Sequence, residues 1–131
     1  MASSNLEVVR TLYERFRPDD PEAALELLSE DFVAEVPPSL SAEPDVYEGH
    51  AGALRYMRGF AGTIDDVRFE PLEIFEEDEH VIAQVRMTGH GAASGIEIEL
   101  PVVVVHRMEG GKIARMDPFP DLDAARKAIR A

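Results

Sequence analysis

The spacing of apolar residues changes once along this chain, from a helical period near the start to a period of two later on. Leu6, Val9, Tyr13 and Phe16 share one face of a helix, whereas apolar and polar residues alternate through most of the stretch from Val67 to Met116. Alternation suits a sheet with one buried face. We therefore expect an α+β fold, a cone-shaped roll in which three to four helices pack on a strongly curved antiparallel sheet.

The expected elements follow one another without a linker or an internal repeat. Helices are predicted over residues 4–16, 20–30, 49–62 and 121–130, and strands over 32–36, 67–75, 80–90, 96–108 and 112–116. A loop is expected over 39–48, an acidic turn over 76–79, and a hairpin turn at Gly110-Gly111. At 131 residues, the chain is expected to form a single domain, 1–131, with one sizeable core.

Charge and composition exclude several classes of function. The net charge of −13 argues against nucleic acid and against anionic membrane surfaces, because both need clustered cations. The chain has no cysteine, and no apolar run approaches the ~20 residues of a membrane helix. The first residues lack the pattern of a signal peptide, so a cytoplasmic location is expected.

Known motifs for metals and cofactors are missing from the sequence. The four histidines, at positions 50, 80, 90 and 106, do not have metal-ligand spacing, and the glycines at 89, 91 and 95 precede a strand rather than a helix. We therefore expect neither a metal nor a cofactor. The remaining candidates are polar groups that could face an apolar cavity.

Three of these candidates are proposed as catalytic. His106 shares its strand face with Val102 and Val104, and an imidazole there can act as an acid, a base or a hydrogen-bonding group. The alternative is a core histidine satisfied by a neighbour. Asp117 follows the last strand and could move protons at a pocket rim, or it could pair with an arginine. Asp121 could line the same rim, or it could cap the last helix.

Seven further residues are expected to contact a ligand. Tyr13 and Tyr47 offer phenol hydroxyls, and Glu35 offers a carboxylate if it points inward, although exposure is the alternative. The others are large apolar side chains on faces that should turn towards the cavity: Phe32, Met57, Met87 and Phe119.

Four segments resemble the nuclear transport factor 2-like superfamily. They are DPEAALELLSEDF (20–32), YEGHAGALR (47–55), VIAQVRMTG (81–89) and GKI (111–113). Together with the order of elements, they are most similar to the SnoaL-like polyketide cyclases and the ketosteroid-isomerase-like proteins. The resemblance implies a cone of helices wrapped by a curved sheet, an apolar pocket for a small molecule, and a homodimer formed through the sheet.

The sequence also departs from these families at their functional positions. The base of ketosteroid isomerase would fall near Val36-Pro37, where there is no aspartate although Glu35 is adjacent. Its proton-donating acid would fall within Val102–Val105, where every residue is valine. We therefore reject steroid-isomerase chemistry of that type. The aspartate of the SnoaL-like cyclases would fall at Asp121 or Asp117, but Ala114, Arg115 and Met116 stand where a tryptophan and a histidine are common.

Three classes of function remain open at this point. The chain could be a cofactor-free acid/base enzyme in which Asp117 or Asp121 removes a proton and His106 or Tyr13 bonds the resulting oxyanion. It could be a protein that binds a small, ring-containing ligand without catalysis. It could be an assembly module, which two outward-facing valines, Val103 and Val105, would favour.

Overall fold

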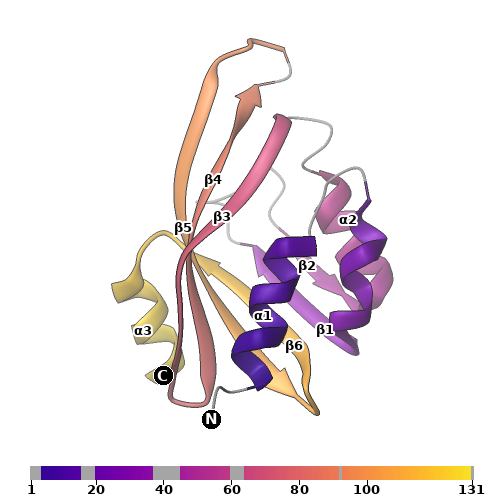
Figure 1. Ribbon diagram of the computed structural model, residues 1–131, viewed down its shortest axis with the longest axis vertical. Coiled ribbons are helices and arrows are strands. Elements are labelled where there is room, and N and C mark those ends of the chain that lie inside the picture. The colour runs from indigo at the N-terminus through magenta and orange to yellow at the C-terminus, as the bar shows by residue number, and fades with distance from the viewer. Residues whose placement is uncertain (1–3, 16–19, 37–44, 60–63, 92, 131) are drawn as a thin grey trace.

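The computed structural model describes residues 4–15, 20–36, 45–59, 64–91 and 93–130. The elements, in chain order, are α1 (Ser4–Arg15), a 3-10 helix η1 (Pro21–Leu27), β1 (Leu28–Val36), β2 (Asp45–Glu48), α2 (Gly49–Gly59), β3 (Ile64–Glu77), β4 (His80–Gly91), β5 (Glu97–Glu109), β6 (Lys112–Phe119) and α3 (Leu122–Arg130). Figure 1 shows long strands with α1 and α2 on one side and α3 on the other. Among the described helices, none is long and apolar enough to cross a membrane.

The six strands form one curved sheet in the order β2-β1-β6-β5-β4-β3. All neighbouring strands are antiparallel except β1 and β6, which run parallel. The sheet is therefore mixed, whereas the sequence predicted a purely antiparallel one. Residues 20–30 also differ from the prediction, because only a 3-10 helix forms and β1 already begins at Leu28. The last four residues of the expected 39–48 loop form β2, and the others lie outside the described residues.

Residues with positive φ occur in both of the turns that the sequence predicted. Gly110 and Gly111 have φ values of 59° and 80° between β5 and β6, which glycine adopts without strain. Asp78 and Glu79 have φ values of 48° and 66° in the acidic turn between β3 and β4. The turns predicted at Gly110-Gly111 and within 76–79 are therefore both present, between β5 and β6 and between β3 and β4.

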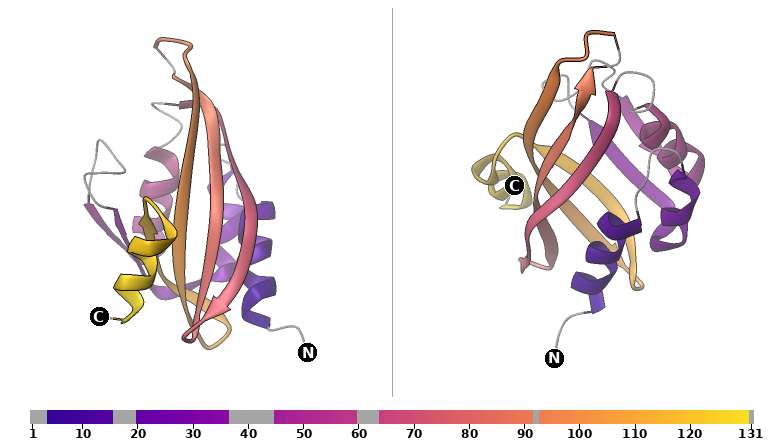
Figure 2. Two further views of the ribbon diagram at one scale, coloured as in Figure 1. Left: turned by 90° about the vertical axis from the view of Figure 1, so that its left-hand side faces the viewer. Right: turned by 45° about the horizontal axis from the view of Figure 1, so that its top comes forward.

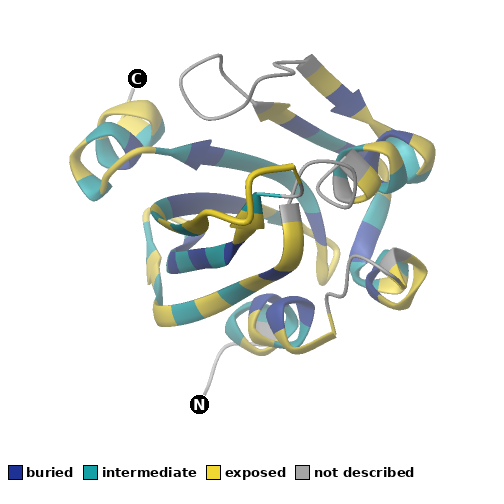
Figure 3. Cartoon of the chain, turned by 90° about the horizontal axis from the view of Figure 1, so that it is seen from above, coloured by how far each residue is buried: buried dark blue, intermediate teal, exposed yellow. Residues whose placement is uncertain are grey.

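Apolar side chains fill both faces of the sheet, and each face has its own helices. We call the cluster under α1 and α2 the inner core and the cluster under α3 the outer core. Figure 2 shows α3 and α1 on opposite sides of the strands, and Figure 3 shows buried and exposed residues alternating along them. The buried inner core comprises Val9, Leu12, Tyr13, Ala24, Leu28, Phe32, Ala34, Tyr47, Ala53, Val81, Ala83, Val85 and Ile113, and the buried outer core comprises Ile82, Val103, Val105 and Ala125.

The two valines that favoured an assembly module are covered by the chain itself. Val103 is 6% exposed and Val105 is 4% exposed, because both pack in the outer core with Ala125 of α3. Their apolar side chains therefore need no second subunit to remove them from water. The expectation that these two valines face outward into solvent was wrong, so they give no reason to expect a dimer formed through the sheet.

Gly52 allows α2 to approach β2 closely. A Cβ on Gly52 would lie 2.9 Å from the carbonyl carbon of Tyr47 and 3.3 Å from its Cα. We expect Gly52→Ala to lower the free energy of unfolding by about 1–3 kcal/mol, because this overpacking outweighs the helix propensity of alanine. Urea unfolding measures it, with the exposed Ala51→Ser as a control that should change by less than about 0.5 kcal/mol. A Gly52→Ala variant as stable as the parent would contradict the close approach.

Candidate functional site

A buried hydrogen-bonded pair, Tyr13 and His106, joins α1 to the inner face of the sheet. The Tyr13 hydroxyl oxygen lies 3.0 Å from Nε2 of His106, and the two rings meet edge to face with centroids 5.7 Å apart. Tyr13 is 9% exposed and His106 is fully buried. The residues are 93 positions apart in the sequence, so only the packing of α1 against the sheet brings them together.

Local periodicity explains why both side chains point to the same interior. Tyr13 lies one helical turn after Val9 on α1, and both belong to the inner core. His106 lies opposite Val81 of β4 and Met116 of β6, and directly paired residues project to the same face of a sheet. Val81 and Met116 both pack in or against the inner core, so the expectation that His106 faces inward is confirmed.

The second ring nitrogen of His106 is also bonded. Nδ1 lies 3.0 Å from the carbonyl oxygen of Val81. Burial lowers the pKa of His106 to about 4, against the opposing effect of the Val81 hydrogen bond. Burial, and then the neighbouring Tyr56, raises the pKa of Tyr13 well above its usual value of 10.0. Both groups are therefore neutral near pH 7 and offer hydrogen bonds rather than charge.

Asp117 lies on the opposite face of the sheet from His106. It pairs with Val105, which packs in the outer core, and its Oδ2 accepts a 2.7 Å hydrogen bond from Nε of Arg115. Nη2 of Arg115 donates to Glu35 at 3.0 Å, and that carboxylate is exposed. The structure thus separates Asp117 and Glu35 from His106, against the expectation that these residues line one cavity. Each shows the alternative stated above: Asp117 pairs with an arginine, and Glu35 is exposed.

Asp121 caps the last helix. Its Oδ1 accepts a 2.8 Å hydrogen bond from the backbone N–H of Ala124, and its carbonyl accepts one from Ala125. This is the capping geometry that was the alternative to a pocket rim. The catalytic roles of Asp117 and Asp121 stay predictions, without a geometric link to the Tyr13–His106 pair.

The apolar residues expected to contact a ligand do not all lie on one face of the sheet. Phe32 is 1% exposed in the inner core, and Met87 is 7% exposed on the same face of β4 as Val85. Phe119 instead packs against the outer core, so it does not share a rim with Phe32. Met57 lies in α2, and its side chain is outside the described part of the structure.

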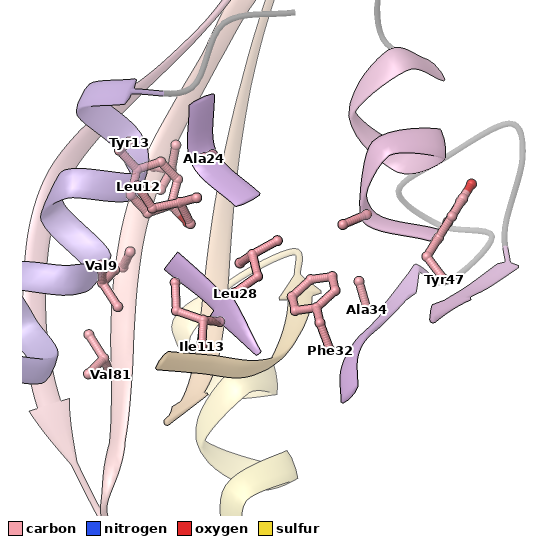
Figure 4. Close-up of a cluster of buried hydrophobic side chains, with 13 residues drawn as sticks. Val9, Leu12, Tyr13, Ala24, Leu28, Phe32, Ala34, Tyr47, Val81 and Ile113 are labelled. Atoms are coloured by element: carbon pink, nitrogen blue, oxygen red, sulfur yellow. The ribbon is translucent and has the colours of Figure 1, made fainter. Parts of the chain in front are cut away.

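Tyr47 belongs to an aromatic group at the β2–α2 end of the inner core. Its ring centroid lies 5.0 Å from that of Tyr56, and the guanidinium carbon of Arg55 lies 4.2 Å from the Tyr47 centroid. Burial and the adjacent Tyr47 raise the pKa of Tyr56 to about 12. Figure 4 shows Tyr13 and Tyr47 at opposite sides of the cluster, with Phe32 between them.

Sequence reasoning missed two parts of this arrangement. The carbonyl of Val81 cannot be identified as the partner of His106 without the register of β4 on β5. Tyr56 does occur within the predicted helix over 49–62, and a phenol near Tyr47 in the sequence was a signal that could have been used. Among the described residues, no three of His, Cys, Asp and Glu gather in a way that could hold a metal ion.

Comparison with known proteins finds the same fold. A family model described as SnoaL-like domain matches residues 9–116. No curated protein matches the sequence. An NTF2-like protein of unknown function from Burkholderia pseudomallei K96243 is 24% identical with a TM-score of 0.81, and the match covers 99% of this chain and 100% of that one.

Two other solved structures were determined with small molecules. TerC, co-crystallised with polyporic acid, is 24% identical with a TM-score of 0.79, over 98% of this chain and 100% of that one. A protein with a ketosteroid isomerase-like fold from Catenulispora acidiphila DSM 44928, in complex with trimethylamine, is 16% identical with a TM-score of 0.76, over 88% and 86%. At these identities, the likeness supports the fold, and the expected resemblance is confirmed at that level.

Proposed function

Because this chain belongs to the SnoaL-like domain family, we propose that it binds a small, largely apolar, ring-containing ligand on the inner face of its sheet. Tyr13 would make the polar contact. The observation that carries the proposal is the Tyr13–His106 pair, a polar unit enclosed by the apolar side chains of the inner core. Ligand sites of this kind combine an apolar lining with a few placed polar groups.

Binding without proton transfer is favoured over acid/base catalysis by the chemistry of the pair. A general base works best when its pKa lies near the working pH, whereas the pKa of His106 is lowered to about 4. The carboxylates proposed as bases, Asp117 and Asp121, are engaged by Arg115 and by the start of α3. The catalytic alternative would gain support if a bound ligand were converted, and if Asp117→Asn or Asp121→Asn abolished that conversion.

A calorimetric titration with polyporic acid, and with a set of two- and three-ring aromatic compounds, tests the proposal. We expect saturable binding, and we expect Tyr13→Phe to weaken it by about tenfold through the loss of one hydrogen bond. Glu70→Gln is the control, because Glu70 pairs with Arg86 at an exposed site of β3 and should not affect binding. If no compound bound, or if Tyr13→Phe bound as tightly as the parent, the proposal would be wrong.

A further inference from the structure

The carbonyl oxygen of Val81 determines which nitrogen of His106 carries the proton. A carbonyl oxygen can only accept, so the 3.0 Å contact requires that Nδ1–H donates to it. In a neutral imidazole the other nitrogen, Nε2, then has a lone pair and no hydrogen. Both sides of this contact are fixed by the sheet, because Val81 and His106 are direct partners in the β4–β5 register.

The tautomer of His106 in turn determines the direction of the Tyr13 hydrogen bond. Nε2 lies 3.0 Å from the Tyr13 hydroxyl and can only accept, so the hydroxyl donates its single hydrogen to the ring. The Tyr13 oxygen can then act towards any other group only as a hydrogen-bond acceptor, through its lone pairs. A chain of donors therefore runs in one direction, from Tyr13 through His106 to Val81.

Reversing this chain would leave buried groups without partners. If Tyr13 donated to a ligand instead, Nε2 of His106 would lose its hydrogen bond at a fully buried position. Moving the ring proton to Nε2 would place the Nδ1 lone pair against the Val81 oxygen. A protonated ring would bond both neighbours, but burial keeps His106 neutral near pH 7. Unsatisfied buried groups of this kind are costly.

Resting on the proposed function above, the geometry points to a ligand that presents a hydrogen-bond donor, a hydroxyl or an N–H, to the oxygen of Tyr13. A bare carbonyl or ether oxygen at the same place would meet a lone pair and be rejected. His106 is a positioning residue, because it acts on the ligand only through Tyr13. This specificity is opposite to that of an oxyanion site, in which the phenol donates.

Three naphthalenes that differ in one substituent test this inference: naphthol, methoxynaphthalene and naphthaldehyde, all substituted at the same ring position. Calorimetry on the wild-type protein should give about tenfold tighter binding of naphthol than of either analogue, since the analogues lack the donated hydrogen bond. Glu70→Gln is again the control, because it changes an exposed side chain of β3 that pairs with Arg86, and it should keep the preference.

Variants at position 106 separate positioning from simple support of the fold. In His106→Phe the Tyr13 hydroxyl has no ring nitrogen to bond, so it can donate to a ligand, and the preference should shift towards naphthaldehyde. His106→Gln offers an amide oxygen that can still accept from Tyr13, so it should keep the preference for naphthol. If His106→Phe does not fold, nitrogen NMR of the wild-type histidines gives the tautomer directly, and a proton on Nε2 would overturn the inference.

The outcomes distinguish this inference from the proposed function. If none of the three naphthalenes binds, and neither does polyporic acid, then the proposed function fails and the inference fails with it. If they bind equally well, or if the aldehyde binds best to the wild-type protein, the inference fails while ligand binding stands. Tighter binding of naphthol that is retained by His106→Gln and lost in His106→Phe would support it.

Discussion

Lowering the pH from about 7 to about 4 should remove about 3 kcal/mol of folding free energy through His106 alone. The pKa of His106 is lowered from 6.5 in a solvated chain to about 4 in the folded protein. Above pH 6.5 both states are neutral at this position. Between these two pKa values the unfolded chain binds a proton that the folded protein excludes, so stability falls as the pH falls. Below about 4 the loss stays constant.

Urea unfolding at a series of pH values measures this effect for the wild-type protein and for His106→Gln. Carboxylates also titrate in acid, but they are the same in both proteins and cancel in the difference. We expect His106→Gln to lose less stability on acidification, and we expect His90→Gln, which removes an exposed imidazole, to follow the wild type. Equal acid sensitivity of the His106→Gln variant and the wild type would show that His106 is not buried in its neutral form.

Replacing Phe32 by alanine should lower the free energy of unfolding by about 3–5 kcal/mol, the largest loss that we expect from one side chain. Phe32 is 1% exposed, and Figure 4 shows it in the middle of the inner core. Removing its ring loses apolar contacts and leaves a cavity that the surrounding strands can close only in part.

Phe119→Ala is the matched control for this measurement. Phe119 lies on the outer face and is only partly buried, so the same deletion should cost clearly less. Urea unfolding of both variants beside the wild type gives the comparison. If Phe32→Ala were no more destabilising than Phe119→Ala, the inner core would not be the main source of stability.

Local patterns in the sequence predicted the long hairpins because their signals are short-range. Alternation over 80–90 matches β4, and Gly110-Gly111 matches the turn between β5 and β6. The outcome for His106 has the same origin, since its neighbours Val102 and Val104 alternate with it. Successive side chains in a strand point to opposite faces of the sheet, so the sequence alone is sufficient to predict which residues of one strand share a face.

The placement of Asp117 was missed because the last strand was ended too early. The strand was predicted to end at Met116, but β6 continues to Phe119. Proline is tolerated there because the described β1–β6 register ends at Met116, so beyond it β6 is bonded through β5. Had the alternation been continued, Asp117 would have fallen opposite in facing to Met116, on the outer face.

The parallel pairing of β1 could not be inferred, because its partner is remote in the sequence. Alternation identifies a strand but gives no information about which other strand it joins. The 3-10 helix η1 shows a related limit: Pro21 and the apolar spacing both favour a helix, yet the chain enters β1 at Leu28. Pairing in the sheet outweighs local propensity in this segment.

The contact between β1 and β6 also sets a condition on how the chain can be synthesised. Leu28 pairs with Ile113 and Ala34 with Met116, so this partner of β1 leaves the ribosome 85 or 82 residues later. Until then one edge of β1 has its backbone groups open to water or to another chain, and pairings over such distances form slowly. A product of interrupted translation that stops before Lys112 is therefore an open-edged fragment prone to aggregate, not a smaller version of the same fold.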